Sequence, residues 1–252
     1  MCTLLLAWRV DPSRPLLVAA NRDELYARPT APATWWSDAP GLLAGRDLEA
    51  GGTWLGVTRG GRFAALTNVR EPGVSPPPGA PSRGRLVADF LRGADGPAAY
   101  LAGVEAGAYA GFNLVVGDAD ALHYLSNRSG ESGPLAPGVH GLANAGLDTP
   151  WPKVRRGRAS LGALAAAGAA TTGALLGLLM DRSAPADDEL PDTGVGLAVE
   201  RMLAPLFVVG PVYGTCSATA VVFHRDGWVD FCERTTRPGP AAHDVVVRFA
   251  RE

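Results

Sequence analysis

Short apolar runs separated by tight turns make up both ends of the chain, and only its middle has helical spacing. The runs lie at residues 3–10, 16–20, 53–58, 62–68, 112–116 and 122–125, and again at 216–223, 228–234 and 244–249. Runs of this length favour antiparallel sheets, which helices must then cover. Because the chain has neither an internal repeat nor a low-complexity linker, we predict one α+β domain over residues 1–252.

Two regions have the spacing of helices. Ser82 is expected to cap a helix whose apolar face includes residues 86–91, and a short helix is expected at 97–104. The segment Leu161–Met180 is uncharged and long enough to cross a bilayer, but it consists mostly of Ala, Gly and Thr. We therefore expect two helices that separate between residues 168 and 173, and no membrane span.

The stretch from Arg28 to Gly52 is rich in proline, tryptophan and glycine. It is too long for a simple connection and is predicted to be a binding loop. Trp35, Trp36 and Trp54 either line an apolar pocket or anchor the core and its loops, and anchoring is the favoured interpretation.

Charge and cysteine usage exclude several classes of function. The chain has 23 basic and 25 acidic residues, a formal net charge of -2, and therefore no basic field for nucleic acid. Its cysteines, Cys2, Cys216 and Cys232, show neither a C-x-x-C pattern nor histidines at metal-ligand spacing. Cys216 and Cys232 are expected to be buried small hydrophobes. Without a secretory signal at the start, we expect a cytoplasmic protein.

Cys2 is the residue with the most distinctive chemistry. Initiator methionine is removed when the next side chain is small, and removal of Met1 would leave Cys2 as the first residue. Its α-amine, with a pKa of about 8, can then act as the base for its own thiol. The alternative interpretation is that Cys2 has no chemical role and is only a small residue tolerated at the start of the chain. The histidines His123, His140, His224 and His243 belong to no catalytic motif.

A second candidate cluster follows the apolar run at residues 16–20. Four polar residues come directly after it: Asn21, Arg22, Asp23 and Glu24. In extended backbone Asn21 and Asp23 face one side while Arg22 and Glu24 face the other, so only one pair can enter a shared pocket. The alternative interpretation is an ordinary surface turn with an Arg–Asp pair.

Motifs that carry a family resemblance extend over nearly the whole chain. They are Met1-Cys2-Thr3, Asn21-Arg22-Asp23-Glu24, Gly51-Gly52-Thr53-Trp54-Leu55-Gly56, Leu66-Thr67-Asn68-Val69-Arg70, Gly141-Leu142-Ala143-Asn144, residues 147–154, residues 190–196 and Tyr213-Gly214-Thr215. On these motifs the chain resembles the NRDE family, also called transport and Golgi organization protein 2-like proteins. That family is similar to the N-terminal-nucleophile hydrolases of the choloylglycine hydrolase and penicillin V acylase group.

The resemblance implies a fold and a set of site residues. The fold is a four-layer αββα sandwich of antiparallel sheets. The residues are Cys2 as nucleophile, Arg22 beside the thiol, and Asn68 and Asn144 near the developing oxyanion. In the acylases an aspartate three positions after the arginine holds the α-amine, whereas here Asp23 follows Arg22 directly. Oxyanion donors are needed because a tetrahedral intermediate carries negative charge.

The chain departs from the family pattern at Cys216, where members usually have an arginine. A charged anchor is therefore missing at this position. Arg201 and Arg234 are the two alternatives for that charge, although their spacing establishes neither.

Two functions of different class are consistent with these residues. The first is hydrolysis of a small N-acyl amide through an acyl-thioester on Cys2, which requires no cofactor. The second follows from what the resemblance implies, because family members have been linked to haem handling and to lipid or acyl-CoA metabolism. In that case the pocket binds a ligand without catalysis, and Cys2 or His140 would ligate haem iron. Both functions imply a small-molecule partner, and the sequence leaves the oligomeric state open.

Overall fold

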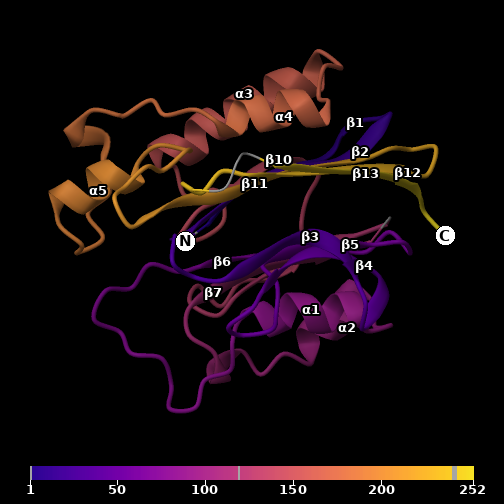
Figure 1. Cartoon of the computed structure of the whole chain (residues 1–252), viewed down its shortest axis with the longest axis horizontal. Coiled ribbons are helices and arrows are strands. Elements are labelled where there is room, and N and C mark those ends of the chain that lie inside the picture. The colour runs from indigo at the N-terminus through magenta and orange to yellow at the C-terminus, as the bar shows by residue number, and fades with distance from the viewer. Residues whose placement is uncertain (1, 119, 240–242) are drawn as a thin grey trace.

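The computed structural model describes residues 2–118, 120–239 and 243–252, and its strands form two antiparallel sheets that lie face to face. Helices cover the outer face of each sheet, so the order of layers is helix, sheet, sheet, helix (Figure 1). The predicted α+β class and the αββα sandwich implied by the family resemblance are both confirmed.

Sheet A contains both ends of the described chain. Across the described residues its strand order is β10 (Gly138–Leu142), β1 (Cys2–Asp11), β2 (Arg14–Leu25), β11 (Tyr213–Phe223), β12 (Trp228–Thr235) and β13 (Asp244–Ala250). Its outer face is covered by α3 (Pro152–Ala166) and α4 (Thr172–Leu179), which contact β1, β2 and β11.

Sheet B is a meander in which each strand pairs with the next along the chain. Within the described ranges its order is β3 (Thr30–Trp36), β4 (Ala39–Asp47), β5 (Leu55–Thr58), β6 (Phe63–Asn68), β7 (Phe112–Gly117), β8 (Leu122–Ser126) and β9 (Ser132–Pro134). Two helices, α1 (Gly84–Arg92) and α2 (Pro97–Ala102), cover its outer face. The remaining helical elements are η1 (Ala106–Ala108), η2 (Asp187–Glu189) and α5 (Leu197–Leu203).

Alternation along the strands divides the core into layers. In β1, Leu4 and Leu6 belong to the cluster between the sheets, whereas Leu5 and Ala7 belong to the cluster beneath α3 and α4. Each fully buried aliphatic side chain contributes about 1.5–3 kcal/mol through removal of its surface from water. Sheet A is thus apolar on both faces, which accounts for the almost continuous apolar character of β1 and β2.

The helical middle of the chain has the predicted break. Ala166 ends α3, Gly168 has a φ of 63°, and α4 begins after Thr171, whose hydroxyl accepts a hydrogen bond from the backbone N–H of Ala174 at 3.2 Å. Over the described part of the chain, every helix is too short or too polar to cross a membrane.

Two predictions about local structure are wrong. Residues 28–52 are not a long loop, because β3 and β4 occupy most of them. Pro32 is tolerated because β3 is an edge strand whose pairing is interrupted between Ala31 and Thr34. Ser82 does not cap α1, since the capping position is Arg83 and no side chain bonds there.

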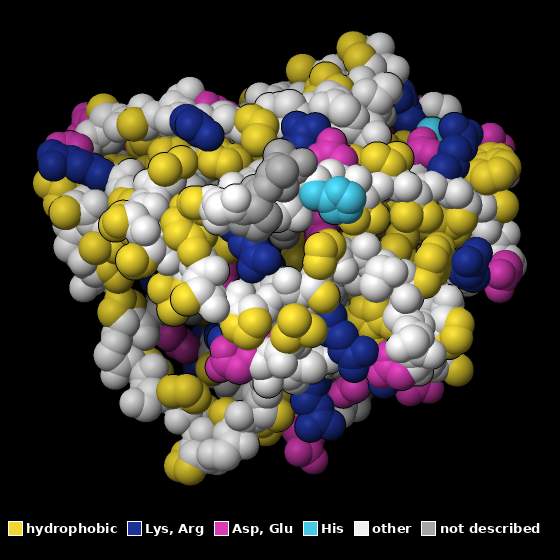
Figure 2. Space-filling model, in the orientation of Figure 1, with side chains coloured by type: hydrophobic (Ala, Val, Ile, Leu, Met, Phe, Trp, Pro, Cys, Tyr) yellow, Lys and Arg dark blue, Asp and Glu magenta, His cyan; other side chains and the backbone are white. Residues whose placement is uncertain are grey.

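The surface mixes the two signs of charge. Figure 2 shows basic and acidic side chains interspersed on the face that it presents. Elsewhere in the structure, ion pairs join groups near the surface, such as Arg201 with Asp187 and Arg234 with Asp244. Pairs of this kind contribute little to stability, because water and salt screen the attraction between exposed charges.

Candidate active site

Cys2 is the first residue of β1 and lies directly opposite Arg22 of β2. Both side chains, together with Glu24, point between the two sheets and line one pocket. Asn21 faces the opposite side, where its amide donates to the carbonyl oxygens of Leu179 and Leu206, each at 2.9 Å. The alternation predicted for residues 21–24 therefore selects Arg22 and Glu24 for the pocket. Strand β2 continues through this tetrad to Leu25.

The pocket has a volume of about 290 Å³ and takes its walls from both sheets. Sheet A contributes Cys2, Arg22, Cys216 and Glu233, and sheet B contributes Asn68. Trp54 and Arg83 line it from the segments that precede β5 and α1. Trp36, in contrast, is buried and donates its indole N–H to the carbonyl of Ala44 at 3.0 Å, and the Trp35 ring packs on Phe249.

The Cys2 side chain is almost enclosed, with 6% of the residue exposed. Burial raises the pKa of its thiol above the ordinary value, and the Arg22 guanidinium opposes this shift without cancelling it. Sulfur in this environment is a neutral thiol near pH 7. A reaction at Cys2 therefore needs a base to remove the proton during attack.

Arg22 is 7% exposed, and its guanidinium lies 3.8 Å from the carboxylate of Glu24. This separation is longer than a charge-assisted hydrogen bond, so the pair is loose. Arg22 therefore supplies positive charge to the pocket beside Cys2.

The two predicted oxyanion residues occupy different places. Asn68, the last residue of β6, lines the pocket. Asn144 is 1% exposed and lies behind it, where its amide donates to the backbone carbonyl of Asn68 at 2.8 Å. The backbone carbonyl of Asn144 accepts a hydrogen bond from the backbone N–H of Arg70, also at 2.8 Å. Asn144 thus fixes the chain on both sides of residue 69.

Asp23 is 1% exposed and lies on the helix-facing side of sheet A. Its carboxylate accepts a hydrogen bond from the Thr215 hydroxyl at 2.7 Å. Burial raises the pKa of Asp23, and the positive charge of Lys153 opposes that rise. Lys153 is itself 2% exposed, donates to the carbonyl of Leu203 at 3.1 Å, and has a pKa lowered by burial.

Glu233 is a buried carboxyl that the sequence did not single out. It is 5% exposed, lines the pocket, and accepts a hydrogen bond from the backbone N–H of Ala33 at 2.7 Å. This bond joins β12 of sheet A to β3 of sheet B. Burial raises the pKa of Glu233 above that of an ordinary carboxyl.

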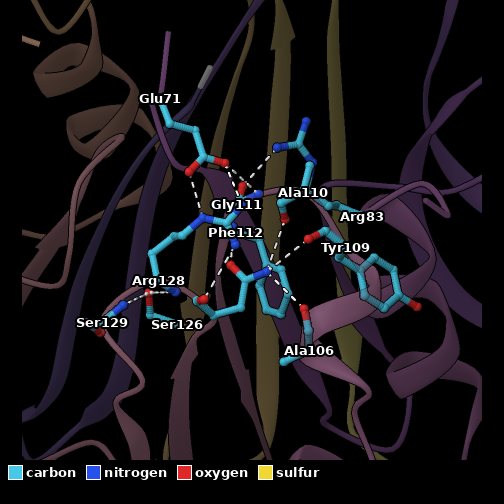
Figure 3. Close-up of polar contacts among 11 residues, drawn as sticks. Glu71, Arg83, Ala106, Tyr109, Ala110, Gly111, Phe112, Ser126, Arg128 and Ser129 are labelled. Atoms are coloured by element: carbon cyan, nitrogen blue, oxygen red, sulfur yellow. Dashed lines mark hydrogen bonds and ion pairs between the residues drawn. The ribbon is translucent and has the colours of Figure 1, made fainter. Parts of the chain in front are cut away.

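Arg83 is a second residue that the sequence did not single out. It precedes α1, and its guanidinium donates to the carbonyl of Gly111 at 2.8 Å. The same Gly111 donates its backbone N–H to Glu71 at 3.0 Å, and Glu71 pairs with Arg128, as Figure 3 shows. The two ends of the proline-rich segment between Glu71 and Arg83 are therefore fastened to one residue.

The missing late arginine is not replaced by either predicted alternative. Arg201 and Arg234 pair with exposed aspartates and do not line the pocket. Cys216 does line it, at an irregularity in the pairing of β11 with β2, and its sulfur lies 3.5 Å from the carbonyl oxygen of Glu24. Cys216 and Cys232 are buried, as expected.

His140, the predicted alternative ligand for haem iron, lies outside the pocket lining. Its Nδ1 lies 2.8 Å from a carboxylate oxygen of Asp148, and its Nε2 lies 2.9 Å from the carbonyl oxygen of Ala136. Both ring nitrogens are thus engaged within the protein. Searched over the described residues, the chain shows no group of three His, Cys, Asp or Glu placed to hold a metal ion.

Comparison with known proteins gives a family and a fold. The sequence model of the family described as "Transport and Golgi organisation 2" matches residues 1–238. A Homo sapiens protein, "Transport and Golgi organization protein 2 homolog", is 38% identical over 248 residues, which cover 90% of this chain and 89% of that protein. The Drosophila melanogaster "Transport and Golgi organization protein 2" is 30% identical over 248 residues, with 87% and 86% covered.

Two solved structures have a similar fold at low identity. One is the Caenorhabditis elegans N-acylethanolamine-hydrolyzing acid amidase ortholog, with a TM-score of 0.52, 11% identity, and coverage of 88% of this chain and 92% of that one. The other is the C2A mutant of the conjugated bile acid hydrolase from Clostridium perfringens, with a TM-score of 0.54, 8% identity, and coverage of 98% and 92%. At such identities the likeness shows the fold alone.

Proposed function

This chain belongs to the Transport and Golgi organisation 2 family, and from that premise we propose that it is an N-terminal-nucleophile cysteine hydrolase of a small N-acyl amide. The observation that carries the proposal is the position of Cys2, at the start of β1 and in the wall of a pocket between two sheets. The fold shared with an acid amidase ortholog and a bile acid hydrolase supports it.

The first step begins after removal of Met1, when the α-amine of Cys2 is free. This amine accepts the thiol proton as the sulfur attacks the carbonyl carbon of the amide. A carbon–sulfur bond forms, and the electron pair of the carbonyl double bond moves to its oxygen. Because burial keeps the Cys2 thiol protonated, transfer to an adjacent base during attack suits this site better than a preformed thiolate.

Asn68 is the group proposed to meet the developing oxyanion, because it lines the same pocket as Cys2. An amide donor aimed at that oxygen contributes about 3 kcal/mol to transition-state stabilisation. Asn144 acts through Asn68 as a positioning residue, since it holds the backbone carbonyl of Asn68 and lies behind the pocket.

The second half of the reaction releases both products. The protonated amine of Cys2 donates its proton to the amide nitrogen as the carbon–nitrogen bond breaks, which leaves an acyl-thioester. Water then loses a proton to the amine and attacks the thioester, so that the carboxylic acid leaves and the thiol is restored. Arg22 would favour negative charge on the sulfur, and Asp23 would orient the amine from the opposite face of the sheet.

The proposed reaction requires no cofactor. Haem binding is the alternative function, with Cys2 or His140 as the ligand to iron. Both ring nitrogens of His140 are engaged by Asp148 and Ala136, so no observation favours His140 as that ligand. Cys2 lines the pocket and stays the candidate ligand for a haem titration.

Two cysteines that line the same pocket allow a matched test of this proposal. Cys2→Ala and Cys216→Ala are assayed against a panel of N-acyl amides that differ in acyl length, with release of the free acid as the readout. We expect Cys2→Ala to lose turnover and Cys216→Ala to keep most of it, because only Cys2 can be next to a free α-amine. Full turnover by Cys2→Ala would eliminate the mechanism.

A further inference from the structure

The arginines that line the pocket differ in what compensates their charge. Arg28 lies 2.8 Å from the carboxylate of Asp47, and Arg46 lies 2.9 Å from that of Asp38. Among the described residues, Arg83 and Arg237 also line the pocket and neither has a carboxylate within 4 Å. Of these two, Arg83 is held in place, because its guanidinium donates to the neutral carbonyl of Gly111 at 2.8 Å. The pocket therefore presents a guanidinium whose charge the protein does not neutralise at contact distance.

The backbone holds Arg83 in a fixed position. Gly84 follows it and packs so tightly on Gly52 that a Cβ added to Gly52 would lie 2.6 Å from the carbonyl carbon of Gly84. The backbone N–H of Thr53 also donates to the carbonyl of Gly84 at 3.2 Å. On its other side the guanidinium is held by Gly111, as Figure 3 shows. The side chain of Arg83 is therefore held in one position before any ligand binds.

A half-buried cation without a counter-ion is unfavourable. Burial lowers the pKa of Arg83, and negative charge on Cys2 would raise it, which agrees with the two residues lining one pocket. An oxyanion on a ligand would relieve this cost. The planar guanidinium suits such a group because it can donate two parallel hydrogen bonds to it.

We infer that Arg83 is a specificity-determining residue that binds an oxyanion group on the ligand of this pocket. The substrate class is then an N-acyl amide that carries a carboxylate or a phosphate, and Arg83 sets the preference for charged over neutral ligands. The assignment of Cys2 as the attacking group rests on the proposed function, whereas binding of the oxyanion does not.

The test uses three decanoyl amides with different head groups: N-decanoylglycine, N-decanoyl-O-phosphoethanolamine and the neutral N-decanoylglycinamide. Affinities are measured by calorimetry on the Cys2→Ala protein, which prevents turnover. Arg83→Gln is added in one variant, and Arg85→Gln is the matched control, because Arg85 is an exposed arginine of α1 that does not line the pocket.

We expect at least one charged amide to bind 10-fold or more tightly than the neutral one, because hydrogen bonds to charged groups are stronger than those between neutral groups. Arg83→Gln should remove that difference, and Arg85→Gln should preserve it. The charged amide that binds more tightly identifies carboxylate or phosphate as the recognised group. Equal affinities for charged and neutral amides, no binding of either charged amide, or preference retained in Arg83→Gln would overturn the inference.

A fold control and a turnover control complete the test. Arg83→Lys keeps the positive charge, so it should keep part of the preference for charged amides. In the Cys2→Ala protein that retains Arg83, 0.5 M salt should reduce this preference. If Arg83→Gln fails to fold, the Arg83→Lys variant and the salt dependence together test whether the charge of Arg83 sets the preference.

Hydrolysis by the wild-type chain is followed in parallel. Charge-selective binding without hydrolysis refutes the proposed function alone, and hydrolysis without charge selectivity refutes the role of Arg83 alone.

Discussion

The environment of Cys2 determines how its sulfur can react. A buried thiol with a raised pKa is a poor spontaneous nucleophile, so its reactivity must increase as the pH rises. We expect modification of Cys2 by iodoacetamide to reach half its maximum rate above pH about 8.5, the ordinary cysteine value. Peptide mass spectrometry over a pH series measures this, with glutathione as the reference thiol. A midpoint below neutrality would indicate a preformed thiolate and contradict the mechanism.

Sequence reasoning located part of the site at the scale of residues. Strand alternation separates Arg22 from Asp23, the position of Cys2 after Met1 indicates the nucleophile, and the family resemblance supplies Asn68. Arg83 and Glu233 were not found because they come from segments distant in sequence, and neither belongs to a recognisable motif. They reach the pocket only in the folded chain, Glu233 from β12 of sheet A and Arg83 from the start of α1, which packs on sheet B.

At the scale of elements, the contact between Gly52 and Gly84 sets the position of α1. Gly52→Ala places a Cβ against backbone that cannot retreat, so we expect a loss of about 1–3 kcal/mol in the free energy of unfolding. Charge-selective ligand binding through Arg83 should weaken with it. Gly41→Ala is the control, because a Cβ there meets nothing within 4 Å. Urea unfolding of both variants gives the comparison, and equal stabilities would contradict the packing argument.

The pair formed by His140 and Asp148 joins β10 to the segment before α3. The hydrogen bond to Asp148 raises the pKa of His140, so this contribution is complete below about pH 6.5 and is lost as the pH rises through the raised value. Burial alone would raise the pKa of Asp148, but hydrogen bonds from His140 and Gly141 lower it, so its contribution is lost as the pH falls below about 4.

Asp148→Asn should therefore cost about 1 kcal/mol of unfolding free energy near pH 5.5 and less at pH 8. Asparagine tolerates the φ of 57° at this position, which isolates the loss of charge. The exposed Asp188→Asn serves as control. Unfolding by urea at the two pH values tests this, and a cost that grows with pH would show that the sign is wrong.

Prediction of elements succeeded where a single periodicity dominated. The break between α3 and α4 was recognised from a cluster of glycines and threonines, and the strands of sheet A from long apolar runs. Residues 28–52 were misread because prolines and exposed side chains on an edge hairpin resemble a loop. Edge strands do not require the continuous burial that makes a strand visible in sequence.

At the scale of the whole molecule, Glu233 connects the two sheets through Ala33. Because burial raises the pKa of Glu233, the folded state retains its proton more strongly than the unfolded state does. Wild-type stability therefore falls as the pH rises above about 4.3 and through the raised value. Glutamine at position 233 has no carboxyl to deprotonate, so Glu233→Gln lacks this pH-dependent loss of stability. It keeps an oxygen that can accept the hydrogen bond from the backbone N–H of Ala33.

We expect Glu233→Gln to gain stability relative to wild type between pH 4 and pH 8. Urea unfolding of the two proteins across that range measures the difference. The difference in unfolding free energy between the two proteins should grow in favour of Glu233→Gln as the pH rises. A constant difference, or one that changes in favour of wild type, would contradict a buried carboxyl of raised pKa between the sheets.

The central claim, that Cys2 is a nucleophile beside its own amine, is tested most directly by intact-mass and peptide mass spectrometry of the protein quenched in acid during turnover of an N-acyl amide. The account predicts a chain that begins at Cys2 and carries one acyl group on the Cys2 peptide. A chain that retains Met1, or acid released while Cys2 stays unmodified under every quench time, would contradict it.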